Sequence, residues 1–408
     1  MTVPTKVLEV ELSSPVTDLL CPEHTRAKVL VRLHGMPLGL VDLTPVDGVV
    51  AGAAVLEAAH GLGLAEHLST DGISDPQDAG HDWACQAVGP QPLPGTLSVV
   101  ICTRDRADSL RLALGSVLTA AGPDVDVVVV DNAPRTDATR TVVDELADPR
   151  VRYLLEARPG LSVARNTGAR AATGEVIAFT DDDVVVDPLW LDGLLRGFTR
   201  SSRVGCVTGL VPSAELETAP QHFFDAKVHW SSSTTRRLYD LTGHRGDSAL
   251  YPYASGMVGT GANFAVARAA YADLGGFDEA LGAGALTRGG EDLDWWVRTL
   301  NGGWTIAYEP SAVVWHRHRR DLESLSDQLY GYGSGLTAYL LKHALTARGF
   351  RHMTRSAVRG LRYSQGRQQQ SVDAGIDPAL LKRERVGMLH GPVLYLRARR
   401  RAAQAARR

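Results

Sequence analysis

The chain has 408 residues, of which 44% are hydrophobic and 22% are charged, and its formal net charge is −3. This composition is ordinary for a globular protein of two or three domains. Its four cysteines lie far apart with no CxxC spacing, which argues against a structural zinc site or a disulfide framework and favours a reducing cytoplasm. The N-terminus lacks the pattern of a secretory signal, and no apolar run approaches the ~18 residues of a membrane span.

The charge is strongly polarised along the chain. Residues 1–95 carry 4 Lys/Arg against 12 Asp/Glu, whereas residues 341–408 carry 16 against 3. Six arginines fall in Arg397–Arg408, after the apolar patch Val393–Leu396. This end fits peripheral contact with an anionic membrane, at the inner face of the plasma membrane, and fits a solvated basic tail equally well. We do not expect nucleic-acid binding, because interleaved aromatic residues and a recognition module are missing.

Composition and periodicity predict four segments. Residues 1–70 combine short β-like runs with a helical stretch over Gly52–Leu68, which indicates a small α+β domain. The Gly, Asp and Pro content of residues 71–95 is typical of a linker. We expect an α/β domain over residues 96–320 and a helical, basic extension over residues 321–408. In that extension, the apolar stripe of residues 325–348 is interrupted by Gly331, Gly333 and Gly335 and predicts a helix packed on the domain.

Strands and helices alternate from Leu97 onward. The predicted strands are Leu97–Thr103, Val125–Val130, Val151–Leu155 and Val176–Phe179, and the helices between them are Ala107–Ala121, Asp137–Leu146 and Leu161–Ala172. This alternation predicts a doubly wound, mostly parallel sheet. Ligands bind such sheets beyond the C-terminal strand ends, so the residues there are the ones to examine.

Three strand ends carry polar residues. The first delivers Thr103-Arg104-Asp105-Arg106, the second Asp131-Asn132, and the fourth Asp181-Asp182-Asp183. Three adjacent carboxylates repel one another, and a divalent metal that holds a phosphate group removes that repulsion. The first strand is not followed by a glycine-rich phosphate loop, so metal and side chains must meet the phosphate charge. A solvated turn ahead of Pro188 is the alternative, but the position of the aspartates at a strand end favours metal binding.

Five motifs in order resemble a known family. They are Val-Val-Ile-Cys-Thr-Arg-Asp-Arg, Val-Val-Val-Asp-Asn-Ala, Gly-Leu-Ser-Val-Ala-Arg-Asn-Thr-Gly, Phe-Thr-Asp-Asp-Asp and Gly-Gly-Glu-Asp-Leu-Asp. Over roughly residues 97–320 they resemble the inverting family-2 glycosyltransferases with the GT-A fold. The resemblance implies a nucleotide-binding half (96–190) and an acceptor half (191–320). It also implies a Mn²⁺ or Mg²⁺ cofactor, a nucleoside-diphosphate sugar donor, with UDP or dTDP favoured, and an acceptor hydroxyl.

The same resemblance assigns roles to residues. It puts Thr103, Arg104, Asp131, Arg165, Asp181 and Asp182 on the donor side, Asp181, Asp183 and His316 on the metal, and Asp292 with Glu291 in catalysis, Asp292 as general base. A slip of one residue would exchange roles within the aspartate motif, and His318 competes with His316. Asp292 could also be a plain helix start, and Asp131 could cap a turn. Gly259–Phe264 resembles the segment that lines the donor sugar, or is a turn ahead of a helix over Ala265–Leu274.

Departures from the family pattern reduce the number of candidate functions. The Gln-x-x-Arg-Trp motif and the membrane spans of processive synthases are missing, which indicates a non-processive transferase. A sugar nucleotidyltransferase is an alternative, but such enzymes usually need the glycine-rich loop that this chain lacks. A catalytically silent carbohydrate-binding or scaffold protein on the same fold is the other alternative.

Overall fold

The computed structural model describes residues 3–62, 64, 95–228, 233–248, 250–351 and 378–405. The predicted linker over residues 71–95 therefore lies outside the described residues, except for Gly95. Among the described residues, no helix is long and apolar enough to cross a bilayer. The domain boundaries themselves stay predictions.

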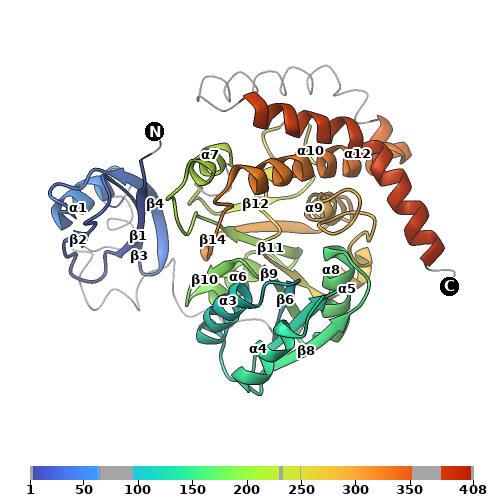
Figure 1. Ribbon diagram of the computed structural model, residues 1–408, viewed down its shortest axis with the longest axis horizontal. Helices are drawn as coiled ribbons and strands as arrows, with labels where there is room; N and C mark the ends of the chain where they lie inside the picture. Colours follow the sequence, from blue (N-terminus) through green and yellow to red (C-terminus); the bar gives the residue numbers. More distant parts are fainter. Residues whose placement is uncertain are drawn as a thin grey trace.

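The N-terminal part of the chain forms a small α+β unit at one side of the molecule (Figure 1). Strand β1 pairs with β3 in parallel, and β3 pairs with β4 in an antiparallel hairpin. Alternate residues of β3 (Val29, Val31 and Leu33) pack against Val55 and Ala59 of α1 in one apolar cluster. The elements are β1 (Thr5–Glu11), β2 (Leu19–Leu20), β3 (Arg26–Leu33), β4 (Met36–Leu43), β5 (Val49–Val50) and α1 (Gly52–His60).

A nine-stranded mixed sheet forms the centre of the molecule, with strand order β10-β14-β11-β13-β9-β6-β7-β8 and β12 paired with β14. Strands β8, β7, β6 and β9 are parallel neighbours, as the alternation predicted. The first half of the sheet contains β6 (Leu97–Thr103), α3 (Ala107–Ala120), β7 (Asp126–Asn132), α4 (Ala138–Leu146), β8 (Val151–Glu156), α5 (Leu161–Ala171), β9 (Val176–Asp181), β10 (Val184–Val186) and α6 (Trp190–Thr199).

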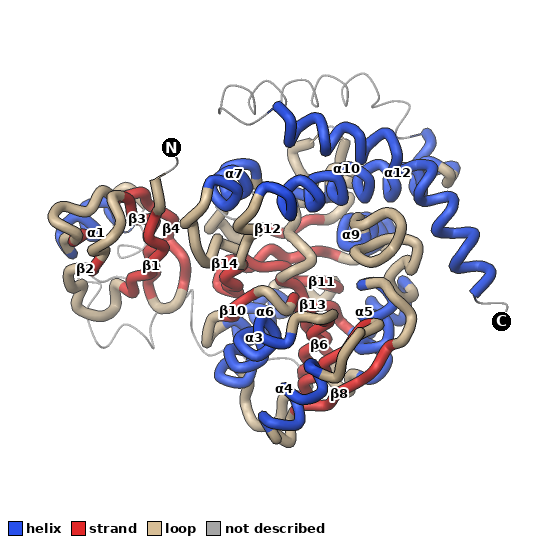
Figure 2. The backbone as a smooth tube through the Cα atoms, viewed as in Figure 1, coloured by secondary structure: helices blue, strands red, loops and turns tan. Residues whose placement is uncertain are grey.

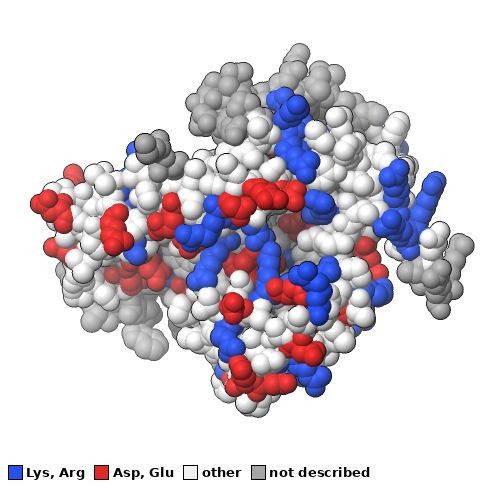
Figure 3. All heavy atoms as spheres, in the orientation of Figure 1, with Lys and Arg blue, Asp and Glu red and all other residues white. Residues whose placement is uncertain are grey.

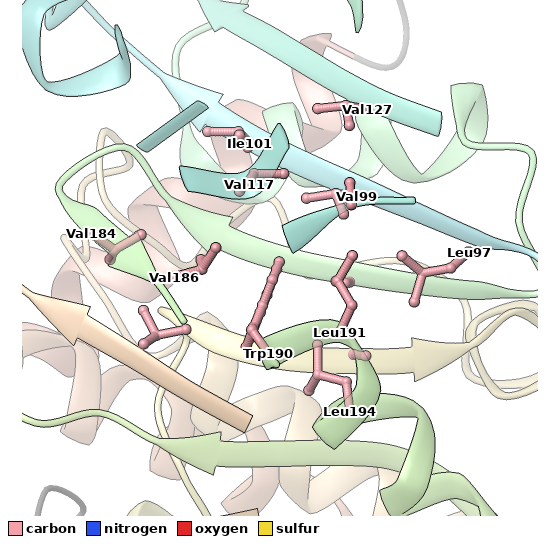
Figure 4. Packing of buried hydrophobic residues seen from close by; sticks show 14 of the residues in the cluster. Leu97, Val99, Ile101, Val117, Val127, Val184, Val186, Trp190, Leu191 and Leu194 are labelled. Carbon is pink, nitrogen blue, oxygen red and sulfur yellow. The ribbon is translucent and has the colours of Figure 1, made fainter. Parts of the chain in front are cut away.

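The sheet is covered on both faces. Val127 and Val129 of β7 belong to one apolar cluster with α3, α4 and α6, and Figure 4 shows Val99 and Ile101 of β6 in the same layer. The alternate residues Val128 and Val130 belong to a second cluster with α5 and the tryptophans of α9. Successive strand side chains point to opposite faces, so a run of valines requires this double cover. The α/β fold class is confirmed.

One prediction is wrong in the second half of the sheet. Asn263–Ala267 is a strand, β13, which pairs antiparallel with both β9 and β11, and the following helix covers only Arg268–Leu274. The predicted helix over Ala265–Leu274 is therefore wrong in its first turn, because burial between two strands overrides local propensity. The remaining elements are β11 (Val204–Leu210), α7 (Ala219–Lys227), β12 (Arg237–Tyr239), η2 (Ser255–Met257), α8 (Arg268–Leu274), α9 (Glu291–Asn301) and β14 (Thr305–His316).

Helices α10 (Leu322–Ala344) and α12 (Pro378–Ala405) lie side by side over α9 (Figures 1 and 2). Glycines on both helices allow the close approach: a methyl group on Gly333 would collide with the carbonyl of Glu384, and one on Gly387 with the carbonyl of Tyr330. On its other side, α10 lies against the loop before α9, where a methyl group on Gly335 would meet Gly289 at 2.5 Å. The glycines therefore serve packing, and α10 connects α12 to the start of α9.

Candidate active site

The topology brings three predicted strand ends together. Strand β6 lies between β7 and β9, so the chain reverses its strand order there, and Thr103 pairs with Asp131 while Cys102 pairs with Asp181. Such a reversal leaves the C-terminal strand ends open to a ligand. Strand β14 arrives from the far end of the sequence, and its pairing with β10 puts His316 opposite Val184.

Asp181, Asp183 and His316 form a cluster whose ligand atoms all lie within 4.8 Å of one another. His316 Nε2 lies 3.2 Å from Asp183 Oδ1. Two carboxylates and one imidazole form a donor set that suits a hard or borderline divalent cation. These side chains therefore fit the metal that the sequence predicted.

Asp182 turns the other way. Thr103 Oγ1 donates to Asp182 Oδ2 at 2.7 Å, and Arg106 Nη1 donates to Asp182 Oδ1 at 2.9 Å. Asp182 and Asp183 form the turn that joins β9 to β10, and in this turn Asp182 lies against Thr103 and Arg106 whereas Asp183 lies with Asp181 and His316. Arg106 also lies 3.1 Å from Asp183 Oδ2, so it connects the two sides of the motif.

Asp181 and Asp183 differ in how much positive charge lies around them. Burial raises the pKa of Asp181 to about 6, although the charge of Arg165 works in the opposite direction. Burial also acts to raise the pKa of Asp183, but His316, Arg106 and Arg319 together hold it well below its ordinary value. A carboxyl group with a raised pKa is one that lacks enough positive charge nearby. A bound cation would supply that charge.

His318 lies behind His316. The Nδ1 atoms of the two rings are 2.9 Å apart, and the His318 ring packs on Phe224 with centroids at 4.5 Å. Burial lowers the pKa of His318 to about 3, so this ring is neutral. Of the two histidines, His316 belongs to the cluster and His318 orients it.

Arg165 connects the cluster to α9. Its guanidinium group lies 3.3 Å from Asp181 Oδ1 and 3.1 Å from Glu291 Oε1, and it donates to the carbonyl of Gly261 at 2.8 Å. The N–H group of Gly261 in turn donates to Asp292 Oδ2 at 3.0 Å. The buried Arg165 thus fixes the carboxylate groups of Asp181 and Glu291 relative to each other.

Glu291 and Asp292 begin α9, where the helix N-terminus favours negative charge. Gly290, with a φ of 89°, precedes them, and a methyl group on it would lie 2.5 Å from the carbonyl oxygen of Gly335, which excludes any side chain at this position. Burial, followed by the charge of Asp292, raises the pKa of Glu291 to about 7. Asp292 is half-buried and is the more accessible of the two carboxylates.

The remaining predicted donor residues lie at the same edge of the sheet. Asp131 is buried and accepts a hydrogen bond from the Tyr153 hydroxyl at 3.0 Å, and burial raises its pKa. The Arg104 side chain is 46% exposed and approaches Asp105 at 3.9 Å. Thr103 is buried against Asp182.

Two arginines outside the set of predicted site residues also reach the cluster. Arg106 bridges Asp182 and Asp183, and Arg319 lies 3.5 Å from Asp183 Oδ2. Both come from arginine-containing runs that follow a strand, Thr103–Arg106 and His316–Arg320. The arginine content of those runs indicated positive charge near the site, but the fold decides which arginine points toward the cluster.

Comparisons with known proteins agree with the motifs. Residues 98–262 match the family model described as Glycosyl transferase family 2. This part of the chain contains the first four of the five motifs and is therefore a family-2 glycosyltransferase domain, as those motifs predicted.

The chain is similar to the pre-mycofactocin glycosyltransferase of Mycobacterium tuberculosis (strain ATCC 25618 / H37Rv), with 27% identity over 60% of this chain and 48% of that protein. It is also similar to the validoxylamine A glucosyltransferase of Streptomyces hygroscopicus subsp. limoneus, with 35% identity over 30% of each chain. Among solved structures, a mannosyltransferase from Pyrobaculum calidifontis in complex with GDP-Man and Mn²⁺ shares 17% identity and a TM-score of 0.45, over 85% of this chain and 96% of that one. The chain thus spans about half the length of the first of these relatives.

Proposed function

We propose that this chain is a metal-dependent, inverting glycosyltransferase. It would move a sugar from a nucleoside-diphosphate sugar, of the uridine or thymidine type, to an acceptor hydroxyl. The observation that carries this proposal is the hydrogen-bonded connection from the metal cluster to the predicted base. Arg165 contacts Asp181 and the carbonyl of Gly261, and the N–H group of Gly261 contacts Asp292.

The proposed reaction is a single displacement. Asp292 accepts the proton of the acceptor hydroxyl, and the acceptor oxygen forms a bond to the anomeric carbon. The bond from that carbon to the diphosphate oxygen breaks, and its electron pair leaves with the nucleoside diphosphate. Attack opposite the leaving group inverts the anomeric centre. A divalent ion, Mn²⁺ or Mg²⁺, held by Asp181, Asp183 and His316 would stabilise the charge of the leaving diphosphate as a Lewis acid.

The other residues would bind and orient. Arg104, which is partly exposed, has room to meet a phosphate oxygen with its planar donor group. Arg106 and Arg319 add positive charge beside Asp183. Asp131 and Thr103 are buried, so contact with the nucleotide would require a local side-chain shift. Glu291, whose pKa is raised to about 7, would serve by holding Arg165 against the cluster.

The test is a screen of nucleotide sugars by thermal shift with and without Mn²⁺, followed by donor hydrolysis. A ligand that binds the folded state raises its melting temperature. With the best donor, we expect Asp292→Asn to reduce hydrolysis by roughly 10²-fold or more while donor binding persists. Asp183→Asn should abolish the metal-dependent shift. Asp137→Asn, at an exposed position before α4, is the matched control.

Two outcomes would count against the proposal. Hydrolysis at the wild-type rate by Asp292→Asn would remove the base assignment. Complete failure of the wild type to bind or hydrolyse any nucleotide sugar would favour the silent carbohydrate-binding alternative.

We also propose that α12 makes peripheral contact with an anionic membrane, which would put the enzyme at the inner face of the plasma membrane. Leu389, Val393 and Leu396 are exposed at spacings of four and three residues, and Leu389 is 77% exposed. Exposed arginines accompany this stripe, and Figure 3 shows Lys and Arg side chains gathered over the C-terminal part of α12. An apolar stripe beside basic residues is typical of helices that lie in a membrane interface.

Sedimentation with vesicles tests this contact. We expect the wild type to bind vesicles that contain phosphatidylglycerol and not vesicles of phosphatidylcholine alone. The triple change Leu389→Ser, Val393→Ser and Leu396→Ser should weaken that binding. Equal binding by the wild type and the triple variant would remove the membrane contact.

A further inference from the structure

Helix α10 connects the two ends of the proposed active site. On one side, a methyl group on Gly331 would meet the carbonyl of Arg288 at 3.1 Å, and Gly335 lies against Gly289, so α10 packs on the loop that leads into Asp292. On the other side, α10 reaches Phe224, whose ring packs on His318 behind the metal cluster. A residue on this part of α10 therefore lies between the metal cluster and the base.

Tyr332 occupies that position. Its ring centroid lies 5.9 Å from that of Phe224, and 37% of the residue is exposed. Burial raises the pKa of its hydroxyl, and the charge of Asp292 raises it further, with Arg319 and Asp181 also within electrostatic reach. Tyr332 is thus surrounded by groups from both ends of the site, yet keeps part of its ring open.

Gln328 accompanies Tyr332 one helical turn earlier, so the two side chains share a face of α10. Gln328 Nε2 donates to the Tyr332 hydroxyl at 3.2 Å. Gln328 Oε1 is buried and has no hydrogen-bond partner in the part of the chain that the structure describes. A buried acceptor without a donor costs free energy, and a small rotation of this half-buried side chain would let a ligand hydroxyl satisfy it.

We propose that Tyr332 and Gln328 form the acceptor-binding site and that the acceptor presents a sugar ring. This inference deepens the proposed function and rests on it. A pyranose ring has one face of C–H groups, which packs on an aromatic ring, and hydroxyl groups at its edge, which donate to an amide oxygen. A flat open ring beside an unpaired amide oxygen matches both features. A serine side chain or a simple alcohol could donate a hydrogen bond to the amide oxygen of Gln328, but it has no ring face to pack on Tyr332.

The nearby Tyr330 provides a matched control. It lies on the same helix and packs mainly on α12, where its hydroxyl contacts His390 Nδ1 at 2.9 Å and its ring centroid lies 4.8 Å from the Arg383 guanidinium carbon, with that of Arg288 at 5.2 Å. Loss of this aromatic ring removes a comparable contact from α10 but none of the contacts that Tyr332 makes with Phe224 and Gln328.

The experiment measures binding of methyl glycosides by saturation-transfer NMR, with the whole 408-residue chain, uridine diphosphate and Mg²⁺. The probes are the methyl pyranosides of glucose, mannose, galactose and N-acetylglucosamine, with glycerol as a non-cyclic polyol. We expect at least one pyranoside to bind the wild type saturably and glycerol not to bind. Tyr332→Leu should weaken that binding about fivefold or more, and Tyr332→Trp should retain it. Tyr330→Leu should bind as the wild type does.

The outcomes separate this inference from the proposed function. If the wild type binds uridine diphosphate with Mg²⁺ but no pyranoside, or if Tyr332→Leu binds the pyranoside as tightly as Tyr330→Leu does, the acceptor site is wrong. If the wild type binds no nucleoside diphosphate, the proposed function itself fails. Thermal melting of each variant identifies any loss of binding that is due to unfolding.

Discussion

His316 and His318 face each other through their Nδ1 atoms, which lie 2.9 Å apart. His316 Nε2 points toward Asp183 on the other side of the ring. If His316 Nε2 binds a metal, its Nδ1 must carry the proton and donate it to a lone pair. The neutral His318 ring supplies that lone pair, which makes it a positioning residue for the metal ligand.

The first prediction follows from this contact. His318→Ala should weaken Mn²⁺ binding by about 10- to 100-fold, because partners of this kind fix the ring of the ligand histidine. His318→Asn should weaken it less, since its amide oxygen can accept the same hydrogen bond. Titration calorimetry with Mn²⁺ in the presence of uridine diphosphate measures both effects. His244→Ala, in the exposed turn after β12, is the control, and a His318→Ala protein with unchanged Mn²⁺ affinity would contradict the positioning role.

The second prediction concerns the register of the three aspartates. Asp183→Asn should abolish measurable Mn²⁺ binding, whereas Asp182→Asn should retain it with a modest loss. The reason is that Asp182 contacts Thr103 and Arg106 and is outside the Asp181, Asp183 and His316 cluster. Electron paramagnetic resonance of free Mn²⁺ gives the bound fraction directly. The reverse order of effects would mean that the motif is shifted by one residue.

The third prediction is a pH dependence of metal affinity. The pKa of Asp181 is about 6 in the metal-free protein, and the negative charge of Asp183 raises that of His316 in spite of burial. Metal binding requires both groups to be deprotonated, so metal and protons compete. Affinity for Mn²⁺ should therefore fall as the pH drops from 7.5 to 5.5, and the fall approaches about tenfold per pH unit for each ligand group once the pH is below the pKa of that group.

Calorimetry in two buffers with different ionisation enthalpies tests this competition. At pH 5.5 the apparent binding enthalpy should differ between the buffers, because protons are released. An affinity that is constant or higher at pH 5.5 would contradict the assignment of Asp181 and His316 as ligands.

Much of the site's location was predictable from the sequence. The alternation of apolar runs with amphipathic segments identified the parallel strands, and parallel strands end at one edge. Asp131 and the aspartate motif therefore had to lie near Thr103 once those strands were recognised. The Gly-Gly-Glu-Asp-Leu-Asp motif predicted that the start of α9 also belongs to the site. No local sequence pattern could have placed it at the same edge of the sheet.

The finer arrangement depended on contacts distant in sequence. Asp181 is the last residue of β9, and the turn of Asp182 and Asp183 that follows it decides which aspartates share a side. Only the pairing of β14 with β10 showed that His316, and not His318, belongs to the metal cluster. Strand β13 has no distinctive pattern, since its strand form comes from two neighbours that complete the sheet. Tyr332 carries no sequence signal, because its position depends on how α10 packs against Gly289.

The fourth prediction concerns Asp294, which lies two residues after Asp292 and has no solvent exposure. It lies 2.8 Å from Arg298 and Lys342 and 3.1 Å from His343, so it joins α9 to α10 beneath the active site. Burial acts to raise its pKa, but these partners hold it far below its ordinary value. Asp294→Asn should lower the free energy of unfolding by about 3–5 kcal/mol at pH 7, because it removes the carboxylate partner of the largely buried Arg298 and leaves Lys342 with Asp278 as its remaining partner.

The sign of the pH effect follows from the lowered pKa. A carboxyl group of this kind contributes stability above its unfolded pKa of about 4, and the contribution is lost as the pH falls below that value. Urea unfolding at pH 7 and about pH 3 should therefore show a smaller difference between wild type and Asp294→Asn at the lower pH. The matched control is Asp327→Asn on α10, whose side chain is 59% exposed and pairs with Arg383. It should change stability by less than about 1 kcal/mol, as exposed ion pairs do. Equal losses in the two variants would mean that the buried network does not stabilise the junction of α9 and α10.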